Sequence, residues 1–197
     1  MSAPVLGVDP GAHGAAVLLP TMTWWAWAPS KAKGQPGWLL HSAEGCSWVA
    51  SFAALGAAVA EEVLALAGGP VPCVLEGLFA RGSGSITLAE RCGELLGGLR
   101  PCVAALARPL AGDRRRGRQG WRRQVLGLSD QTGAAAAEGA AIARARREGW
   151  LPRGLSASAQ GAVAEAGLMA LWREPETSRT PQRRQPRIGR VGTKGAR

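Results

Sequence analysis

A short apolar run that ends in an acid and a tight turn places the strongest constraint on the fold. Residues 5–19 read VLGVDPGAHGAAVLL. The apolar residues before Asp9 have the pattern of a buried strand, PGAHG is a turn sequence, and the apolar run then resumes. This order predicts an antiparallel hairpin. Asp9 is one of only three aspartates in the chain, and a carboxylate beside a buried strand is costly without a partner. It either hydrogen-bonds its own turn or binds a metal ion.

The rest of the chain shows an alternation of strand and helix patterns. After a third strand over 23–28, we expect a helix, a strand, a second helix, a further strand and then three helices. A mixed α/β sheet with helices on both faces is the fold class that this order predicts. The expected elements are a helix over 47–67, a strand over 71–76, a helix over 85–99, a strand over 102–107 and helices over 121–126, 133–148 and 157–172.

Three acids occupy comparable places in these elements. Asp9 ends the strand VLGVD, Glu76 ends the strand CVLEG, and Glu165 lies in the late Ala-rich helix GAVAEAGLMALW. Neighbouring strand ends can bring two carboxylates close together, and a helix packed across them can supply a third. Clustered carboxylates repel one another unless a hard cation joins them, and Mg²⁺ prefers such oxygen ligands. Each acid taken alone also has a purely structural explanation.

The charge is distributed very unevenly along the 197 residues. Residues 1–99 contain four Lys or Arg and seven acids, a net charge of −3, whereas residues 100–197 contain 20 and seven, a net charge of +13. A strongly basic half is expected of a protein that binds a polyanion, nucleic acid above all. The alternative is a solvated face with a basic tail. Residues 1–172 are expected to form one domain, and 173–197 a basic disordered tail.

Three sequence blocks carry a resemblance to a known family. VLGVDPGAHGAAVL, CVLEGLFA and AEAGLMALW resemble, in this order, the active-site blocks of RuvC-type Holliday junction resolvases. Within that family the chain is most similar to the chloroplast resolvases of plants and algae, where a Trp followed by a basic residue precedes the last two helices, as in GWRRQVLGLSDQTG. The likeness spans roughly Val5 to Trp172.

The resemblance implies a fold, an activity and a site. The fold is a ribonuclease H-like mixed sheet of about five strands flanked by helices. The activity is a Mg²⁺-dependent endonuclease, with Mn²⁺ as a substitute, which acts as a homodimer and cuts two strands of a four-way DNA junction symmetrically. Asp9, Glu76 and Glu165 are then the catalytic metal ligands. The compartment implied is the chloroplast nucleoid, or else a bacterial or phage-host cytoplasm, and neither a membrane nor a nucleotide cofactor is expected.

The last helix departs from the family pattern. Members carry a second acid or a histidine one turn before the final acid, whereas this chain has Gly161 and Ala162 there, after Gln160. Asp130 and Glu138 are the nearest unassigned acids, but nothing in their spacing places them in the site. We therefore expect weakened metal binding. The alternative is a non-catalytic protein that binds junctions with the same fold.

A second group of residues is expected to contact DNA. Arginine is well suited to bidentate phosphate contacts, and an aromatic residue near the second acid could wedge into opened bases. A solvated charge run and ordinary core packing are the respective alternatives. The expected contacts are Phe79, Arg81, Gly82, Ser83, Arg114, Arg115, Arg116, Arg118, Trp121, Arg122 and Arg123.

The length of the chain excludes one further class of protein, the actin-like ATPases. Actin-like ATPases also begin with a strand, an Asp and a Gly-rich hairpin, but they need two such lobes, and this chain has one GVDPG block. The four cysteines form no CxxC pair, so we expect small buried hydrophobic residues rather than a zinc site.

Overall fold

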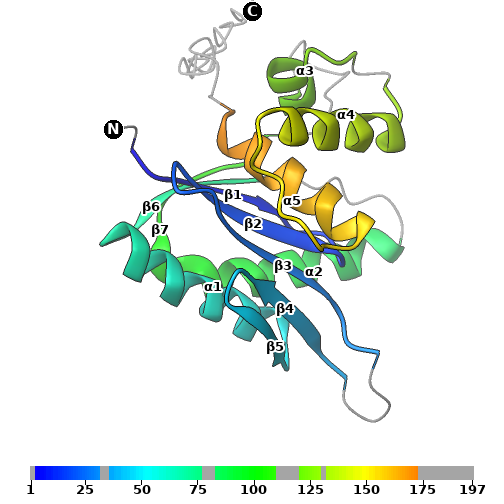
Figure 1. Ribbon diagram of the computed structural model, residues 1–197. Helices are drawn as coiled ribbons and strands as arrows, with labels where there is room; N and C mark the ends of the chain where they lie inside the picture. Colours follow the sequence, from blue (N-terminus) through cyan, green and yellow to red (C-terminus); the bar gives the residue numbers. More distant parts are fainter. Residues whose placement is uncertain (1–2, 32–35, 77–82, 110–119, 130–131, 173–197) are drawn as a thin grey trace, which may run out of the picture.

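A single seven-stranded sheet organises the molecule (Figure 1). The structure, a computed structural model, describes residues 3–31, 36–76, 83–109, 120–129 and 132–172. The strand order is β5-β4-β3-β2-β1-β6-β7. Each of the strands β1 to β4 pairs antiparallel with the strand that follows it in the sequence. In contrast, β6 pairs parallel with both β1 and β7. The strands are β1 (Val5–Asp9), β2 (Gly14–Leu19), β3 (Thr23–Pro29), β4 (Trp38–Ser42), β5 (Gly45–Val49), β6 (Val71–Leu75) and β7 (Val103–Ala107).

Helices cover both faces of this sheet. On one face lie α1 (Phe52–Ala67) and α2 (Ser83–Leu99), and on the other lies α5 (Ala157–Ala170), with α3 (Trp121–Leu126) and α4 (Ala134–Arg147) beyond it (Figure 1). Alternate residues of the strands face the two layers. Leu6 and Val8 of β1 pack with α1, whereas Ala15 and Val17 of β2 pack with α5. The expected class, a mixed α/β sheet with helices on both faces, is therefore confirmed, with seven strands instead of about five.

The approach of α5 to β1 depends on a glycine. A Cβ atom placed on Gly7 would lie 2.0 Å from the carbonyl oxygen of Ala166 and 2.8 Å from the backbone nitrogen of Ala170. Any side chain at this position would force the helix away from the strand. Gly7 therefore lets the backbone of α5 cross β1 in direct contact, two residues from the acid that ends the strand.

The sequence-based elements differ from the structure mainly before the first helix. The helix expected over 47–67 begins at Phe52, with Ser51 as its N-cap, and Ser47 to Val49 belong instead to strand β5. The sequence does not predict the β4–β5 hairpin, because β5 is largely exposed and neither strand has a simple apolar alternation. The later strands and helices begin within two residues of the expected positions.

Two further observations concern the chain as a whole. None of the helices in the described ranges is long and apolar enough to cross a membrane. Cys73, Cys92 and Cys102 are buried and Cys46 is exposed, and all four are free thiols. The residues expected to form the tail, 173–197, lie outside the described part.

Candidate active site

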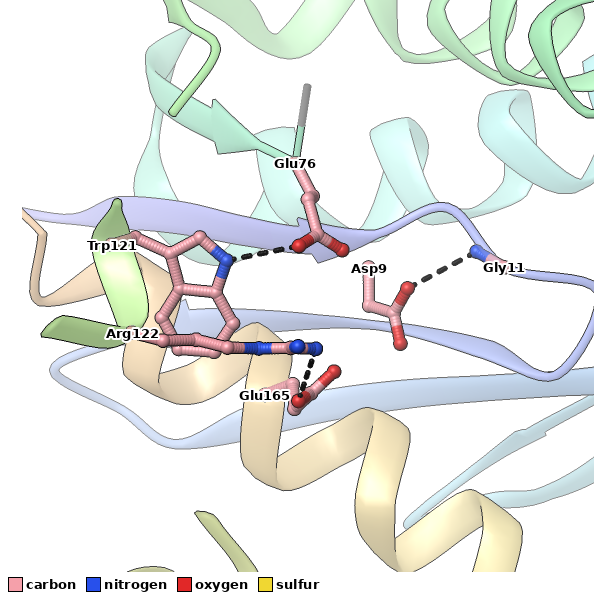
Figure 2. A network of polar contacts seen from close by, with 6 residues as sticks. All are labelled: Asp9, Gly11, Glu76, Trp121, Arg122 and Glu165. Carbon is pink, nitrogen blue, oxygen red and sulfur yellow. Dashed lines mark hydrogen bonds and ion pairs between the residues drawn. The ribbon is translucent and has the colours of Figure 1, made fainter. Parts of the chain in front are cut away.

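Two acids meet at the carboxyl ends of neighbouring parallel strands. Val8 of β1 is in register with Leu75 of β6. The backbone N–H of Glu76 donates to the carbonyl of Val8 at 3.3 Å. Asp9 and Glu76 therefore leave the sheet side by side, and Figure 2 shows both carboxylates facing the same space. The parallel pairing of β1 with β6 brings these two acids together at one edge of the sheet, which is where the sequence predicts them.

A third acid comes from the helix that crosses these strands. Glu165 lies near the middle of α5 and is only 8% exposed, the one charged residue in the described ranges that is classed as buried. Its neighbours on the helix are almost all Ala or Gly, so α5 can lie flat on β1 and β2. Figure 2 shows the Glu165 carboxylate pointing toward Asp9.

The environment of Asp9 opposes its negative charge. Its Oδ1 accepts a hydrogen bond from the backbone N–H of Gly11 at 3.2 Å, as in an Asx turn. The turn is held by Trp27, whose indole Nε1 donates to the carbonyl of Gly11 at 3.0 Å. Burial, followed by the charges of Glu76 and Glu165, raises the pKa of Asp9 from 3.8 to about 8. The turn hydrogen bond is thus real, and it coexists with strong electrostatic coupling to the other two acids.

Two adjacent residues of α3 contact two of the three carboxylates. The indole Nε1 of Trp121 donates to Glu76 Oε1 at 3.1 Å, and Nη2 of Arg122 donates to Glu165 Oε1 at 2.8 Å (Figure 2). Burial raises the pKa of Glu165 to about 7, although the Arg122 guanidinium acts against this shift. The Nε atom of Arg122 is buried without a hydrogen-bond partner in the described part of the chain. The site therefore combines three acids with one guanidinium.

The residues of this site suit a metal ion in their chemistry but not in their positions. The donor set consists of carboxylate oxygens, and the pKa values of Asp9 and Glu165 are raised, which is the chemistry that a hard divalent cation requires. The positions are less favourable, because no three His, Cys, Asp or Glu side chains of the described residues lie close enough together to hold one. As they are placed here, the three acids do not form a closed cation site within the described residues.

The position one turn before Glu165 is not empty. A Cβ atom on Gly161 would lie 2.1 Å from Oε1 of Glu138 and 2.8 Å from its carboxyl carbon. The carboxylate of Glu138, from α4, therefore lies against the backbone of α5 where a side chain of residue 161 would begin. Spacing within the sequence does not reveal this contact, because it depends on how α4 packs on α5. Asp130 lies outside the described residues.

The residues expected to contact DNA divide into three groups. Trp121 is fully buried and contacts Glu76, so we do not propose further that it touches DNA. Arg122 faces Glu165, Arg123 is exposed on α3, and Ser83 is the first residue of α2. The remaining expected contacts lie outside the described residues: Phe79, Arg81, Gly82, Arg114, Arg115, Arg116 and Arg118.

Comparisons with known proteins give a weak structural match. No family model matches the sequence, and no curated protein matches it. Among solved structures, the chain is similar to the Thermus thermophilus RuvC structure, with 16% identity, a TM-score of 0.44, and coverage of 84% of this chain and 92% of that one. It is also similar to T. thermophilus RuvC in complex with Holliday junction substrate, with 17% identity, a TM-score of 0.44, and coverage of 85% and 92%. Similarity at this level does not establish the family of this chain.

Proposed function

We propose that this protein is a divalent-cation-dependent endonuclease that resolves four-way DNA junctions. The observation that carries the proposal is the meeting of Asp9, Glu76 and Glu165, which come from two strand ends and a crossing helix (Figure 2). Carboxylates with raised pKa values, such as those of Asp9 and Glu165, are concentrated at functional sites. The sequence blocks that contain these acids are those that resemble the resolvase active site, and the basic half of the chain suits a nucleic-acid substrate.

The three acids are the residues that would hold the cation. Mg²⁺, when bound, activates water and stabilises the leaving oxygen of a phosphodiester. The N–H of Gly11 orients the Asp9 carboxylate, and the indole of Trp121 orients that of Glu76. Nη2 of Arg122 donates to Oε1 of Glu165 and orients that carboxylate. Each acid therefore has a defined neighbour that limits its rotation, which is a condition for precise ligand geometry.

Arg122 is suited to bind the substrate as well as Glu165. A guanidinium recognises phosphate oxygens and carboxylates with the same planar donors. Its side chain is 20% exposed beside Glu165, and its buried Nε has no hydrogen-bond partner in the described ranges. We infer that Arg122 binds the scissile phosphate beside the three acids. Arg122 would then take part in the reaction as well as stabilise the fold.

The proposal also includes the oligomeric state. Symmetric cutting of two strands needs two sites, and the chain contains one set of acids. A homodimer that presents two sites to one junction is the simplest assembly that meets this need. Sedimentation of the protein with and without junction tests this part.

A cleavage assay tests the activity. Labelled four-way junction and linear duplex of the same arm sequence are incubated with the protein in Mg²⁺, in Mn²⁺ or in EDTA. We expect cutting of the junction alone, in the metal lanes alone, and two symmetric nicks. Cutting of both substrates, or cutting in EDTA, would contradict the proposal.

A second candidate is a non-catalytic protein that binds junctions with the same fold. It is favoured by the finding that no three acidic, histidine or cysteine side chains of the described residues are arranged to hold a cation. The same assay separates the two candidates, because binding of the junction without cutting at any metal concentration favours the second.

A further inference from the structure

The backbone of Gly11 connects the Asp9 carboxylate to a tryptophan of β3. The N–H of Gly11 donates to Asp9 Oδ1 at 3.2 Å (Figure 2), and the carbonyl of the same residue accepts from the indole Nε1 of Trp27 at 3.0 Å. Trp27 is only 2% exposed, so little water competes for this bond. Gly11 is therefore fixed at both of its backbone polar groups, by Asp9 at one and by Trp27 at the other.

The indole and the carboxylate lie on opposite faces of the sheet. Asp9 is in register with Ala15 of β2, and Ala15 packs in an apolar cluster with residues of α5. Trp27 instead belongs to the cluster that contains Phe52 of α1. Cross-strand partners project to the same face of a sheet, so the Asp9 side chain faces α5 and the Trp27 side chain faces α1. Trp27 therefore acts on Asp9 through the backbone of the turn rather than by direct contact.

A glycine in β2 gives the indole the space to reach this turn. Gly14 is in register with Trp27. A Cβ atom on Gly14 would lie 2.7 Å from both Cε2 and Cζ2 of Trp27, and 2.4 Å from the carbonyl oxygen of Asp9. Any side chain at position 14 would push the ring or the turn away. The hydrogen bond from Trp27 to Gly11 thus depends on the absence of a side chain at Gly14.

The preceding carbonyl of the turn is held from α2. The thiol of Cys92 is 5% exposed and lies 3.9 Å from the carbonyl oxygen of Pro10, to which it donates a weak hydrogen bond. Two successive carbonyls, those of Pro10 and Gly11, therefore accept from side chains of α2 and β3. The turn that carries Asp9 is tied to both elements.

A second buried indole on β3 provides a comparison. A buried tryptophan usually finds an acceptor for its N–H group wherever one is in reach. Trp25 is 0% exposed and donates to Oε2 of Glu62 in α1 at 2.6 Å. Trp25 and Trp27 thus belong to the same strand and the same apolar cluster. They differ in that the bond of Trp27 ends at the turn of Asp9.

We propose that Trp27 is a positioning residue of the candidate active site, which fixes the orientation of the Asp9 carboxylate through Gly11. The inference rests on the proposed function, because the reaction that it serves is the cleavage proposed above. Reacting groups must be held to within a fraction of an ångström, and their supporting hydrogen bonds provide this precision. A bond between two elements restrains the turn more than the Asx turn alone does.

Junction cleavage by two matched variants tests the role in the reaction. Trp27→Phe keeps an aromatic ring but removes the N–H donor, and we expect kcat to fall by about 10-fold. The KM for the junction should not change, because the indole lies on the opposite face from the acids. Trp25→Phe is the control, since it removes an equally buried indole bond from the same strand. It should cut at the wild-type rate, and thermal unfolding checks that both variants fold.

Hydrogen exchange measured by NMR tests the contact without any cleavage. The Gly11 amide should exchange about 5-fold faster in Trp27→Phe than in wild type, the factor that one net hydrogen bond provides. It should exchange at the wild-type rate in Trp25→Phe. In the wild-type chain itself, the indole N–H of Trp27 should exchange more slowly than that of Trp48, whose side chain is 42% exposed. Equal exchange of these two indoles would overturn the proposal without the use of a variant.

The outcomes separate this inference from the proposed function. If the wild-type chain cuts junctions and Trp27→Phe cuts them equally fast, the positioning role is overturned and the proposed function stands. An equal loss of kcat in Trp25→Phe also overturns it, because the effect is then one of general stability. If the wild-type chain cuts no junction, the proposed function is overturned, and the exchange of Gly11 still decides whether Trp27 holds the turn of Asp9.

Discussion

The carboxylate of Asp9 is held where three influences meet. Its turn stabilises the charged form through the N–H of Gly11, whereas burial and the two neighbouring acids destabilise it. The balance favours the protonated form near neutral pH in the absence of a cation. A residue in this position is costly to the fold and useful to a reaction, which is the usual trade-off at active sites.

Asp9→Asn should separate binding from cutting. The amide keeps the size of the side chain but removes the charge that would hold a cation, so we expect junction cleavage to fall by at least about 100-fold. Junction binding should be unchanged or stronger, because one negative charge that faces the phosphates is lost. Cleavage rates and gel-shift affinities of both proteins check this prediction. A variant that cuts normally would remove Asp9 from the site.

The same substitution should change the pH dependence of stability. The folded-state pKa of about 8 exceeds the unfolded value of 3.8, so the folded protein binds more protons between these limits. The free energy of unfolding should therefore fall as the pH rises from 5 to 8. Asp9→Asn should remove much of this fall and be more stable than wild type at pH 8 by more than about 1 kcal/mol, the equivalent of one pKa unit. Urea unfolding in EDTA at both pH values measures it, and parallel curves would contradict it.

Among the elements, α5 shows most clearly what a sequence can predict. Its acid, its apolar pattern and its bounds follow from residues 157–172 alone, as do the two strand ends that it crosses. The contact of Glu138 with Gly161 does not follow, because it depends on how α4 packs on α5. The β4–β5 hairpin does not follow from the sequence either, since the exposed residues of β5 have no pattern of burial.

Two adjacent glycines of α2 allow a test of close helix packing. A Cβ on Gly98 would lie 2.1 Å from the carbonyl oxygen of Ala53 in α1, whereas one on Gly97 would meet nothing within 4 Å. Gly98→Ala must push the two helices apart, so we expect a loss of about 2 kcal/mol or more. Gly97→Ala should instead gain up to about 1 kcal/mol from helix propensity. Denaturant unfolding compares them, and equal effects would show that α1 and α2 pack less closely than described.

At the scale of the whole molecule, the two halves of the chain differ in net charge and in the residues that they contribute to the candidate site. The first half has a net charge of −3 and contributes six of the seven strands and two of the three acids. The second half has a net charge of +13 and contributes α5 together with the Arg122 and Glu138 side chains. Acids that would hold cations therefore lie in a molecule whose remaining charge attracts a polyanion.

Removal of residues 173–197 should weaken DNA binding without preventing cutting. This segment contains eight Lys or Arg and two Glu, and none of the three acids of the candidate site. Each phosphate contact contributes about −0.9 to the slope of log affinity against log salt. Truncation should therefore lower the affinity for junction and duplex alike and make the slope less negative, while the junction is still cut at saturating protein.

A full-length control with the eight basic residues changed to Gln should behave like the truncated chain, because charge rather than length is responsible. Filter binding over a series of NaCl concentrations gives both slopes. If the slopes of the wild-type and truncated proteins are equal, the phosphate contacts lie entirely within residues 1–172.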